Sequence, residues 1–149
     1  MTPNPAYVQA IRDNVHEAPY PHLIGLRIAE LEFDSCRIEL ALGERHMQPF
    51  GIVHGGVLAT LIDTATFWAV FMRLPENAGL VNVDLKLNYL KAVTGGHLRA
   101  EGRCLRAGRQ ISYAEASVFD EAGELLAHGT STLMALPGKG LTLGVAKFL

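Results

Sequence analysis

The sequence predicts an α+β protein in which one antiparallel sheet curls around a long, buried central helix. Segment 56–73 has the length of a helix, and its apolar residues occupy nearly every angle around a helical axis. Strand-like runs with a period of two follow it, separated by turn signals. A helix that is apolar on all sides is buried on most of them. A sheet with one apolar face is the layer available to cover it.

The chain before the central helix is expected to form a short helix and two strands. Asn4 and Pro5 fit an N-cap followed by proline at the first helical position, which predicts a helix over about 5–16. The sequence "APYPH" then ends that helix. The stretch "LIGLRIAELEFDSCRIELALG" predicts two strands with a turn near Asp34 and Ser35.

The chain after the central helix is expected to form four strands. The first, in "LVNVDLKLNYL", alternates polar residues with an apolar face made of Val81, Val83, Leu85, Leu87 and Tyr89. Three more strand-like runs follow at 97–106, 110–119 and 124–135. The turn signals "VTGG", "RAGRQ" and "DEAGE" between successive runs predict an antiparallel meander. No linker or repeat divides the chain, so residues 1–149 are expected to form one domain with a tail at 137–149.

The composition argues against several classes of function. The chain has 13 basic and 15 acidic residues and a net charge of -2, which predicts no binding to nucleic acid or to anionic membranes. The N-terminus lacks the basic flank and apolar stretch of a signal peptide. The apolar run 57–71 is too short and too interrupted to span a bilayer comfortably. We therefore expect a cytoplasmic protein.

Cysteines and histidines show no metal-binding spacing. Cys36 and Cys104 lie far apart in strand-like runs and fit no CxxC pattern, so they are expected to be buried free thiols. The histidines other than His54 are scattered and offer no zinc ligand set. The sequence therefore predicts a protein without a metal or redox cofactor.

Asp63 is the only acid within the central helix. On that helix it shares a narrow face with Thr60 and Thr66, three residues away on either side. In one interpretation it is a buried structural acid, satisfied by those two hydroxyls. In the other it is functional, because aspartate has poor helix propensity, its burial is costly, and no Lys or Arg lies within a turn. Burial raises a carboxyl pKa toward the range that suits a general base, so we favour the functional interpretation.

Three glycines, Gly51, Gly55 and Gly56, lie just before the helix. Free backbone N–H groups at a helix N-terminus suit an anion or a developing oxyanion. A tight turn that merely needs glycine is the alternative, because His-Gly-Gly alone is a weak signal. His54 has no Ser or Cys partner in the loop and no orienting acid, so we expect it to bond the loop backbone.

The spacing of Gly55 and Asp63 carries a further expectation. The two residues are eight positions apart, or about 12 Å along a helix that rises ~1.5 Å per residue. One substrate carbonyl therefore does not reach both groups in a single chain. If both act on one substrate, they come from different subunits of a dimer.

Three stretches carry a family resemblance: "QPFGIVHGGVLATLIDTA", "VNVDLKLNYLKAVTGGHLRAEGRCLRAGR" and "AEASVFDEAGELLAHGTSTLMAL". In this order they resemble the hot-dog fold acyl-CoA thioesterases, specifically the phenylacetate-pathway (PaaI-like) branch, over about residues 20–136. The resemblance implies a curved antiparallel sheet around one long helix. It also implies homodimers through edge-strand pairing, often paired again into tetramers, with active sites at the dimer interface. Coenzyme A enters only as part of the acyl-CoA substrate.

The resemblance also implies roles for individual residues. Asp63 matches the catalytic acid, which acts as general base for water or as a nucleophile that forms an anhydride. Gly55 matches the residue whose backbone N–H polarises the thioester carbonyl. Gln48 matches a position that holds the carbonyl or the attacking water. Asn82 falls at a polar position that orients water, although a solvent-facing strand residue is an equal alternative.

One position departs from the family pattern. Some relatives carry a hydroxyl residue one turn after the acid, where this chain has Phe67, and the nearby hydroxyls are those of Thr64 and Thr66. The expected catalytic group is Asp63, Gly55, Gln48, Asn82 and His54. The expected substrate-binding group is Gly56, Phe67, Lys91, Arg106 and Arg109, in which the three cations would meet CoA phosphates or would simply be solvated turn residues.

The function expected from these residues is hydrolysis of an acyl-CoA to a free acid and CoA. Two alternatives belong to other classes. A hot-dog dehydratase acting on hydroxyacyl thioesters would need a working histidine and an acid across the site. A non-catalytic acyl-CoA binding or sensing domain would keep the pocket but would not require Asp63.

Overall fold

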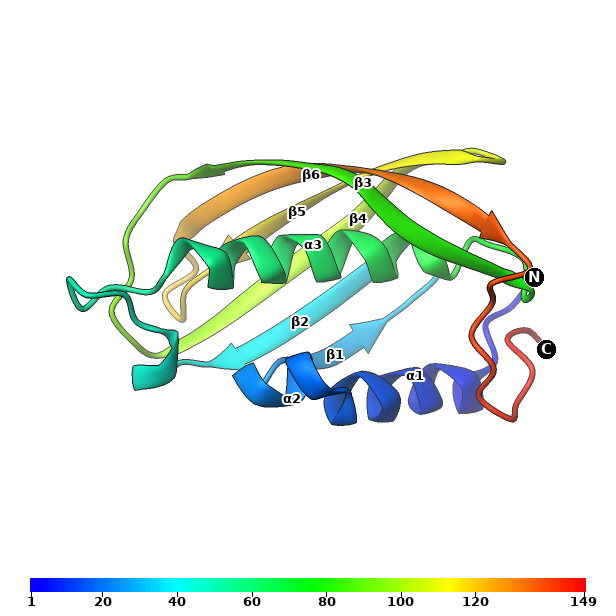
Figure 1. The fold of residues 1–149 in the computed structure, drawn as a ribbon, viewed down its shortest axis with the longest axis horizontal. Helices are drawn as coiled ribbons and strands as arrows, with labels where there is room; N and C mark the ends of the chain where they lie inside the picture. The colour runs from blue at the N-terminus through cyan, green and yellow to red at the C-terminus, as the bar shows by residue number, and fades with distance from the viewer.

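The computed structural model describes all 149 residues and contains a single six-stranded sheet. Its helices are α1 (Pro5–Glu17), α2 (Pro19–Ile24), the 3-10 turn η1 (Glu44–His46) and α3 (Gly55–Phe71). Its strands are β1 (Arg27–Leu31), β2 (Ser35–Ala41), β3 (Ala78–Tyr89), β4 (His97–Ala107), β5 (Ile111–Phe119) and β6 (Leu125–Pro137). Figure 1 shows the sheet curving around α3, with α1 and α2 beside β1. The predicted fold class is therefore confirmed.

Helix α3 forms where the sequence predicts the central helix, and it is apolar on almost every side. Leu61, Ile62 and Ala65 are completely buried against the sheet. The helix backbone approaches β4 so closely that a Cβ on Gly102 would lie 2.3 Å from the Ala65 carbonyl oxygen. Glycine at this position therefore lets the sheet wrap tightly around the helix.

The order of the strands differs from the predicted meander. The sheet runs β1-β2-β4-β5-β6-β3, with every neighbouring pair antiparallel. Strands β4, β5 and β6 follow one another as expected, but β3 pairs with β6 rather than with β4. The side of β4 that β3 would have occupied is taken by β2, in register from Ser35 opposite Arg103 to Ala41 opposite His97. Residues 90–96 therefore cross the fold instead of forming a tight turn.

Strand β3 also departs from its predicted alternation. Its pairing with β6 shifts register just after Asn82. The two valines of the expected apolar face point outward: Val81, before this bulge, is 40% exposed, and Val83, the residue that the bulge adds, is 58% exposed. Beyond it the expected face is kept, and Leu85 and Leu87 pack against the core. A bulge adds one residue to one strand, so it reverses which side chains face inward.

Two predictions, one for the "APYPH" stretch and one for the burial of the cysteines, were incomplete. The "APYPH" stretch ends α1 as expected, but Pro19 then starts the short helix α2, which closes on Gly25 in the left-handed conformation at φ 79°. The cysteines are free: Cys36 is buried, whereas Cys104 is only partly buried. Burial raises the pKa of both thiols. No helix has both the length and the apolar character needed to cross a membrane.

The tail packs across the end of α3. Lys147 is fully buried at 0% exposure, and its Nζ donates to the carbonyls of Phe71, at 2.6 Å, and Leu74, at 2.9 Å. The ammonium also lies 4.1 Å from the centre of the Phe71 ring. The backbone carbonyl of Lys147 accepts from the Asn4 N–H at 2.9 Å, which ties the tail to the start of α1. Burial lowers the pKa of Lys147 to about 8, against an opposing effect of Glu76.

Candidate functional site

The loop before α3 is shaped by a turn at Gly51. Gly51 has φ 78°, a left-handed conformation that favours glycine, and its N–H donates to the Gln48 carbonyl at 2.9 Å. The Gln48 side-chain oxygen accepts from the backbone N–H of Phe50 within the same turn. The Gln48 amide nitrogen makes no hydrogen bond with the chain, so it remains free to donate. Phe50 itself is exposed at the loop tip and does not line a core.

His54 is the N-cap of α3, as the sequence predicted for a histidine that bonds the loop backbone. Its Nδ1 accepts from the Gly56 N–H at 2.8 Å. A Cβ on Gly56 would lie 2.9 Å from that nitrogen, so the second glycine leaves room for the cap. The His54 N–H donates to the His46 carbonyl at 2.8 Å.

His46 holds this loop in place and was missed from the sequence. It is 2% exposed, its Nδ1 accepts from the Gly43 N–H at 2.9 Å, and its Nε2 donates to the Ile24 carbonyl at 2.7 Å. Both ring nitrogens are therefore used in linking α2 to the loop. A histidine among charged residues before the loop offers no sequence signal of this burial.

Gly55 keeps a free N–H at the start of α3. The Gly56 N–H is taken by His54, and the Val57 N–H donates to the His54 carbonyl at 2.9 Å. The N–H of Gly55 has no such partner, and it points out of the positive end of the helix. A Cβ on Gly55 would lie 3.0 Å from the ring and the hydroxyl of Tyr89, so an aromatic side chain covers this glycine. Gly56 was expected to bind substrate, but its N–H is already used by His54.

The Asp63 carboxylate is half-buried and has no hydrogen-bond partner in the chain. Thr60 instead pairs with the Tyr20 hydroxyl at 2.7 Å. Thr66 donates to the Ile62 carbonyl at 2.9 Å and meets Ser131 at 2.8 Å. The two threonines therefore do not satisfy the acid, as the structural interpretation of Asp63 had required. Burial raises the pKa of the Asp63 carboxyl.

Asn82 lies beside Asp63 because of the bulge in β3. Its side-chain amide donates to the Asp63 backbone carbonyl at 3.4 Å, so it faces α3 rather than solvent. Phe67, one turn further along α3, is half-buried and stacks on Phe71 with ring centres 5.9 Å apart. The structure thus brings Asp63 and Asn82 together, with an apolar wall one turn away.

The expected phosphate-binding cations do not gather around the glycine loop of the same chain. Arg106 is at the end of β4 and Arg109 in the turn to β5, which Figure 1 shows at the opposite end of α3 from that loop. Lys91 forms an ion pair with Glu124. No group of three His, Cys, Asp or Glu side chains is arranged to hold a metal ion.

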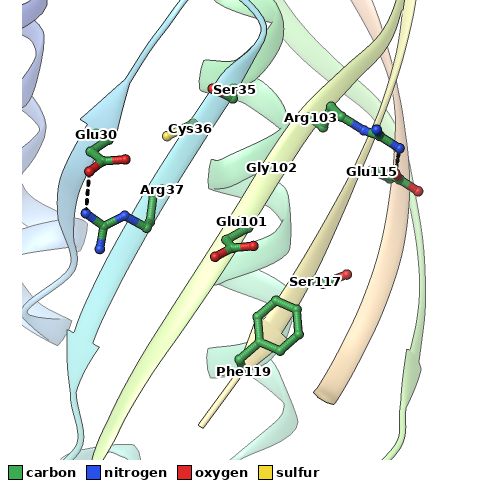
Figure 2. A pocket seen from close by; sticks show the side chains of 10 residues that line it. All are labelled: Glu30, Ser35, Cys36, Arg37, Glu101, Gly102, Arg103, Glu115, Ser117 and Phe119. Carbon is green, nitrogen blue, oxygen red and sulfur yellow. Dashed lines mark hydrogen bonds and ion pairs between the residues drawn. The ribbon is translucent and has the colours of Figure 1, made fainter. Parts of the chain in front are cut away.

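A hollow of about 380 Å³ lies over Gly102, on the side of the sheet away from α3, as Figure 2 shows. Its charged groups are all in ion pairs: Arg37 with Glu30 at 2.7 Å and Arg103 with Glu115 at 2.7 Å. Glu101 pairs at 2.7 Å with Arg99, which lies outside the hollow. This hollow therefore offers no free charge to a ligand, and it contains none of the candidate residues.

Comparisons with known proteins agree with this geometry. A family model described as the Thioesterase superfamily matches residues 50–127. The proofreading thioesterase EntH of Klebsiella pneumoniae is 33% identical over 100 residues, which cover 67% of this chain and 73% of EntH. The crystal structure of a Haemophilus influenzae thioesterase superposes with a TM-score of 0.81 at 25% identity, covering 87% of this chain and 90% of that one. A thioesterase family protein from Silicibacter pomeroyi gives a TM-score of 0.81 at 29% identity, covering 89% and 99%. The chain therefore belongs to the thioesterase superfamily, and its fold is the hot-dog fold.

Proposed function

We propose that this protein is an acyl-CoA thioesterase of the PaaI-like branch, acting as one domain without a metal or redox cofactor. The observation that carries the proposal is Asp63. Its carboxylate is half-buried without a hydrogen-bond partner, and burial raises its pKa. An acid kept in that state in a core helix suits proton transfer near neutral pH. The thioesterase relatives support the same class of reaction.

In the proposed reaction, Asp63 removes a proton from a water molecule that attacks the thioester carbonyl carbon. The negative charge that develops on the carbonyl oxygen is stabilised by the Gly55 N–H. Collapse of the tetrahedral intermediate breaks the carbon–sulfur bond, giving the carboxylic acid and the CoA thiolate, which takes up the proton. Asn82, beside Asp63, and the free amide of Gln48 are the groups proposed to hold the water and the carbonyl.

The alternative role of Asp63 is direct attack on the carbonyl carbon, which gives an anhydride and CoA before water releases the acid. A single turnover in water enriched in heavy oxygen tests the anhydride route. Water that attacks the Asp63 carbonyl of the anhydride leaves the label in the Asp63 side chain, where mass spectrometry of the protein detects it. Label in the product acid alone fits the general-base route and also an anhydride opened at the acyl carbon.

We further propose that the site is shared between two subunits that pair through β3. Both Gly55 and Asp63 lie on the continuous helix α3, eight residues apart, and therefore about 12 Å apart along its axis. The β1 edge of the sheet is protected, because α1 lies along it in Figure 1 and Arg12 donates to the Ile28 carbonyl at 3.0 Å. The β3 edge carries the exposed Val81 and Val83 and has no such cover. Pairing of two β3 edges would bring Asp63 toward Gly55 of the partner subunit.

The test of the activity is release of free thiol from a panel of aromatic and aliphatic acyl-CoA thioesters. Asp63→Asn should lower kcat by at least about a hundredfold while the protein stays folded. Asp13→Asn, an exposed aspartate on α1, is the matched control and should leave turnover unchanged. Unchanged turnover in Asp63→Asn would refute the mechanism. Acyl-CoA binding without thiol release would instead favour the sensing domain.

The dehydratase alternative is weakened by His54. Because its Nδ1 accepts from the Gly56 N–H, the neutral ring carries its proton on Nε2. That nitrogen is then a donor and not a base, whereas a dehydratase histidine must accept a proton from the substrate.

The shared site is tested by placing a charged side chain on the open β3 edge. Val83→Lys should weaken self-association in analytical ultracentrifugation and make the activity per chain fall on dilution, because a lysine blocks edge pairing. Ile111→Lys changes another exposed apolar residue, 49% exposed and on an inner strand, and should do neither. A fully active monomer would refute the shared site.

A further inference from the structure

Tyr89 is the residue at the end of β3, and it lies directly over the first glycine of α3. The Cζ atom and the hydroxyl oxygen of Tyr89 are each 3.0 Å from the position that a Cβ on Gly55 would take. Contacts of that length are tighter than ordinary van der Waals contact, so a side chain at residue 55 would push the Tyr89 ring away by a few tenths of an ångström. The glycine therefore lets the tyrosine ring of the same chain lie close to the start of the helix.

Tyr89 faces the helix because it continues the inward-facing side of β3 beyond the bulge. Beyond the bulge, Leu85 and Leu87 pack into the core, and Tyr89 follows them in the period of two on the same face of the strand. The strand ends there, at the N-terminal end of α3. The ring consequently lies over the glycine while 58% of the residue remains exposed to solvent.

The Tyr89 hydroxyl has no partner within the chain. Tyr7 donates to the Leu141 carbonyl at 3.3 Å, and Tyr20 pairs with Thr60 at 2.7 Å. Tyr89 makes no such bond, although its hydroxyl is beside the free Gly55 N–H. Two unused donors thus lie next to each other at the positive end of the helix.

We propose that Tyr89 is a further catalytic residue, whose hydroxyl donates a second hydrogen bond to the thioester carbonyl oxygen held by Gly55. The distances allow it. The hydroxyl oxygen is 3.0 Å from the Cβ position of residue 55, and that position is about 2.5 Å from the backbone nitrogen. The two donors are therefore at most about 5.5 Å apart, and one carbonyl oxygen that accepts along its two lone-pair directions bridges donors about 5 Å apart.

The chemical consequence is an oxyanion site in which the Gly55 N–H and the Tyr89 hydroxyl act together, beside the Gln48 amide proposed above. The helix holds the first donor, and the ring that carries the second packs on the glycine. Donors positioned before substrate arrives stabilise the charge that develops on the carbonyl oxygen more than the uncharged ground state. This inference rests on the proposed thioesterase activity.

The test is Tyr89→Phe, which removes the hydroxyl and keeps the ring over Gly55. We expect kcat with the best acyl-CoA substrate to fall roughly tenfold to a hundredfold, with KM changed less than about threefold. Tyr113→Phe is the matched control, because Tyr113 lies on the outer face of β5 and is also partly exposed. Turnover by Tyr89→Phe equal to that of Tyr113→Phe would overturn the inference. Absence of thiol release by the unmodified protein would instead refute the proposed function itself.

Gly55→Ala provides a second measurement. Alanine keeps the backbone N–H, but its Cβ would displace the Tyr89 ring and hydroxyl. If alanine acts by disturbing the tyrosine donor, Gly55→Ala and Tyr89→Phe lose kcat for the same reason. The kcat of the double variant is then little lower than that of the poorer single variant. Losses that multiply fully in the double variant would show that the two residues act independently.

Discussion

Replacement of Lys147 by methionine tests the most heavily buried charge in the protein. The ammonium of Lys147 is completely buried, donates to two carbonyls at the end of α3, and has its pKa lowered by burial to about 8, from 10.5 for an ordinary lysine. Methionine keeps the length of the side chain and its apolar contacts but cannot take up a proton. The substitution therefore isolates the proton equilibrium of this one group.

The expected size follows from linkage. Between about pH 8 and pH 10.5 the folded chain binds fewer protons at Lys147 than the unfolded chain does, so the free energy of unfolding rises with pH across that window. A difference of about 2.5 pKa units corresponds to about 3 kcal/mol. Below about pH 8 the charged lysine exerts its full destabilising effect. Above about pH 10.5 that effect is gone.

The assay is urea denaturation of the unmodified protein and of Lys147→Met at pH values from about 7 to 10.5. The difference in unfolding free energy between the two proteins should shift by about 3 kcal/mol in favour of the unmodified protein as pH rises. Other groups that titrate in this range cancel in the difference. Lys139→Met, an exposed lysine of the same tail, should give a difference that stays constant.

A difference between the unmodified protein and Lys147→Met that does not change with pH would refute the reasoning. It would mean that Lys147 keeps an ordinary pKa, and hence that the tail leaves the end of α3 in solution.

Three further predictions concern the site and its loop. Asp63→Asn should raise the melting temperature near neutral pH and have no such effect near pH 4. The reason is that burial raises the pKa of the Asp63 carboxyl above its ordinary value of 3.8, so the free energy of unfolding falls as pH rises above that value. Equal effects at both pH values would contradict this. His46→Leu should lower the free energy of unfolding by about 2–4 kcal/mol in urea titrations, since the Gly43 N–H and the Ile24 carbonyl lose their partners. A change below about 0.5 kcal/mol would mean that these two hydrogen bonds of His46 are not formed in solution. Gly56→Ala should cost about 1 kcal/mol by pushing the His54 ring off its cap, whereas Gly95→Ala, where a Cβ meets nothing within 4 Å, should be nearly neutral.

The central helix was predictable because its signals are local. Its apolar residues lie on all sides, glycines precede it and Pro75 follows it, so its start and end were predicted within one or two residues of Gly55 and Phe71. The partial burial of the Asp63 carboxyl and the rise in its pKa were also predictable, because an acid in a helix that is apolar on all sides is partly buried wherever the helix packs. His54 was interpreted correctly for a similar reason, since its partner is only two residues away.

The order of the strands was not predictable from the same kind of signal. Glycine in "VTGG" marks a change of direction whether the chain turns back on itself or crosses the fold. The strand order depends on two pairings: β2 pairs with one side of β4, and β3 pairs with β6. Both partners are distant in sequence.

The bulge in β3 and the partners of the threonines were missed for a related reason. Polar and apolar residues alternate through the whole of "VNVDLKL", so nothing in the segment marks the point after Asn82 where register shifts. Thr60 and Thr66 share the helix face of Asp63, but their hydroxyls find Tyr20 and Ser131, 40 and 65 residues away. Contacts of this kind exist only once the fold is complete.

In the proposed shared site, the position of Asn82 would couple assembly to chemistry. Its amide is held beside the Asp63 backbone by a bulge in a strand whose outer edge is open. A partner strand at that edge would contact the bulge, and so would change the free energy of holding the amide beside Asp63. By thermodynamic reciprocity, a ligand that engages Asn82 would then change the affinity of the edge for its partner by the same factor. Under this proposal, a substrate analogue bound at Asp63 would also be an effector of subunit association.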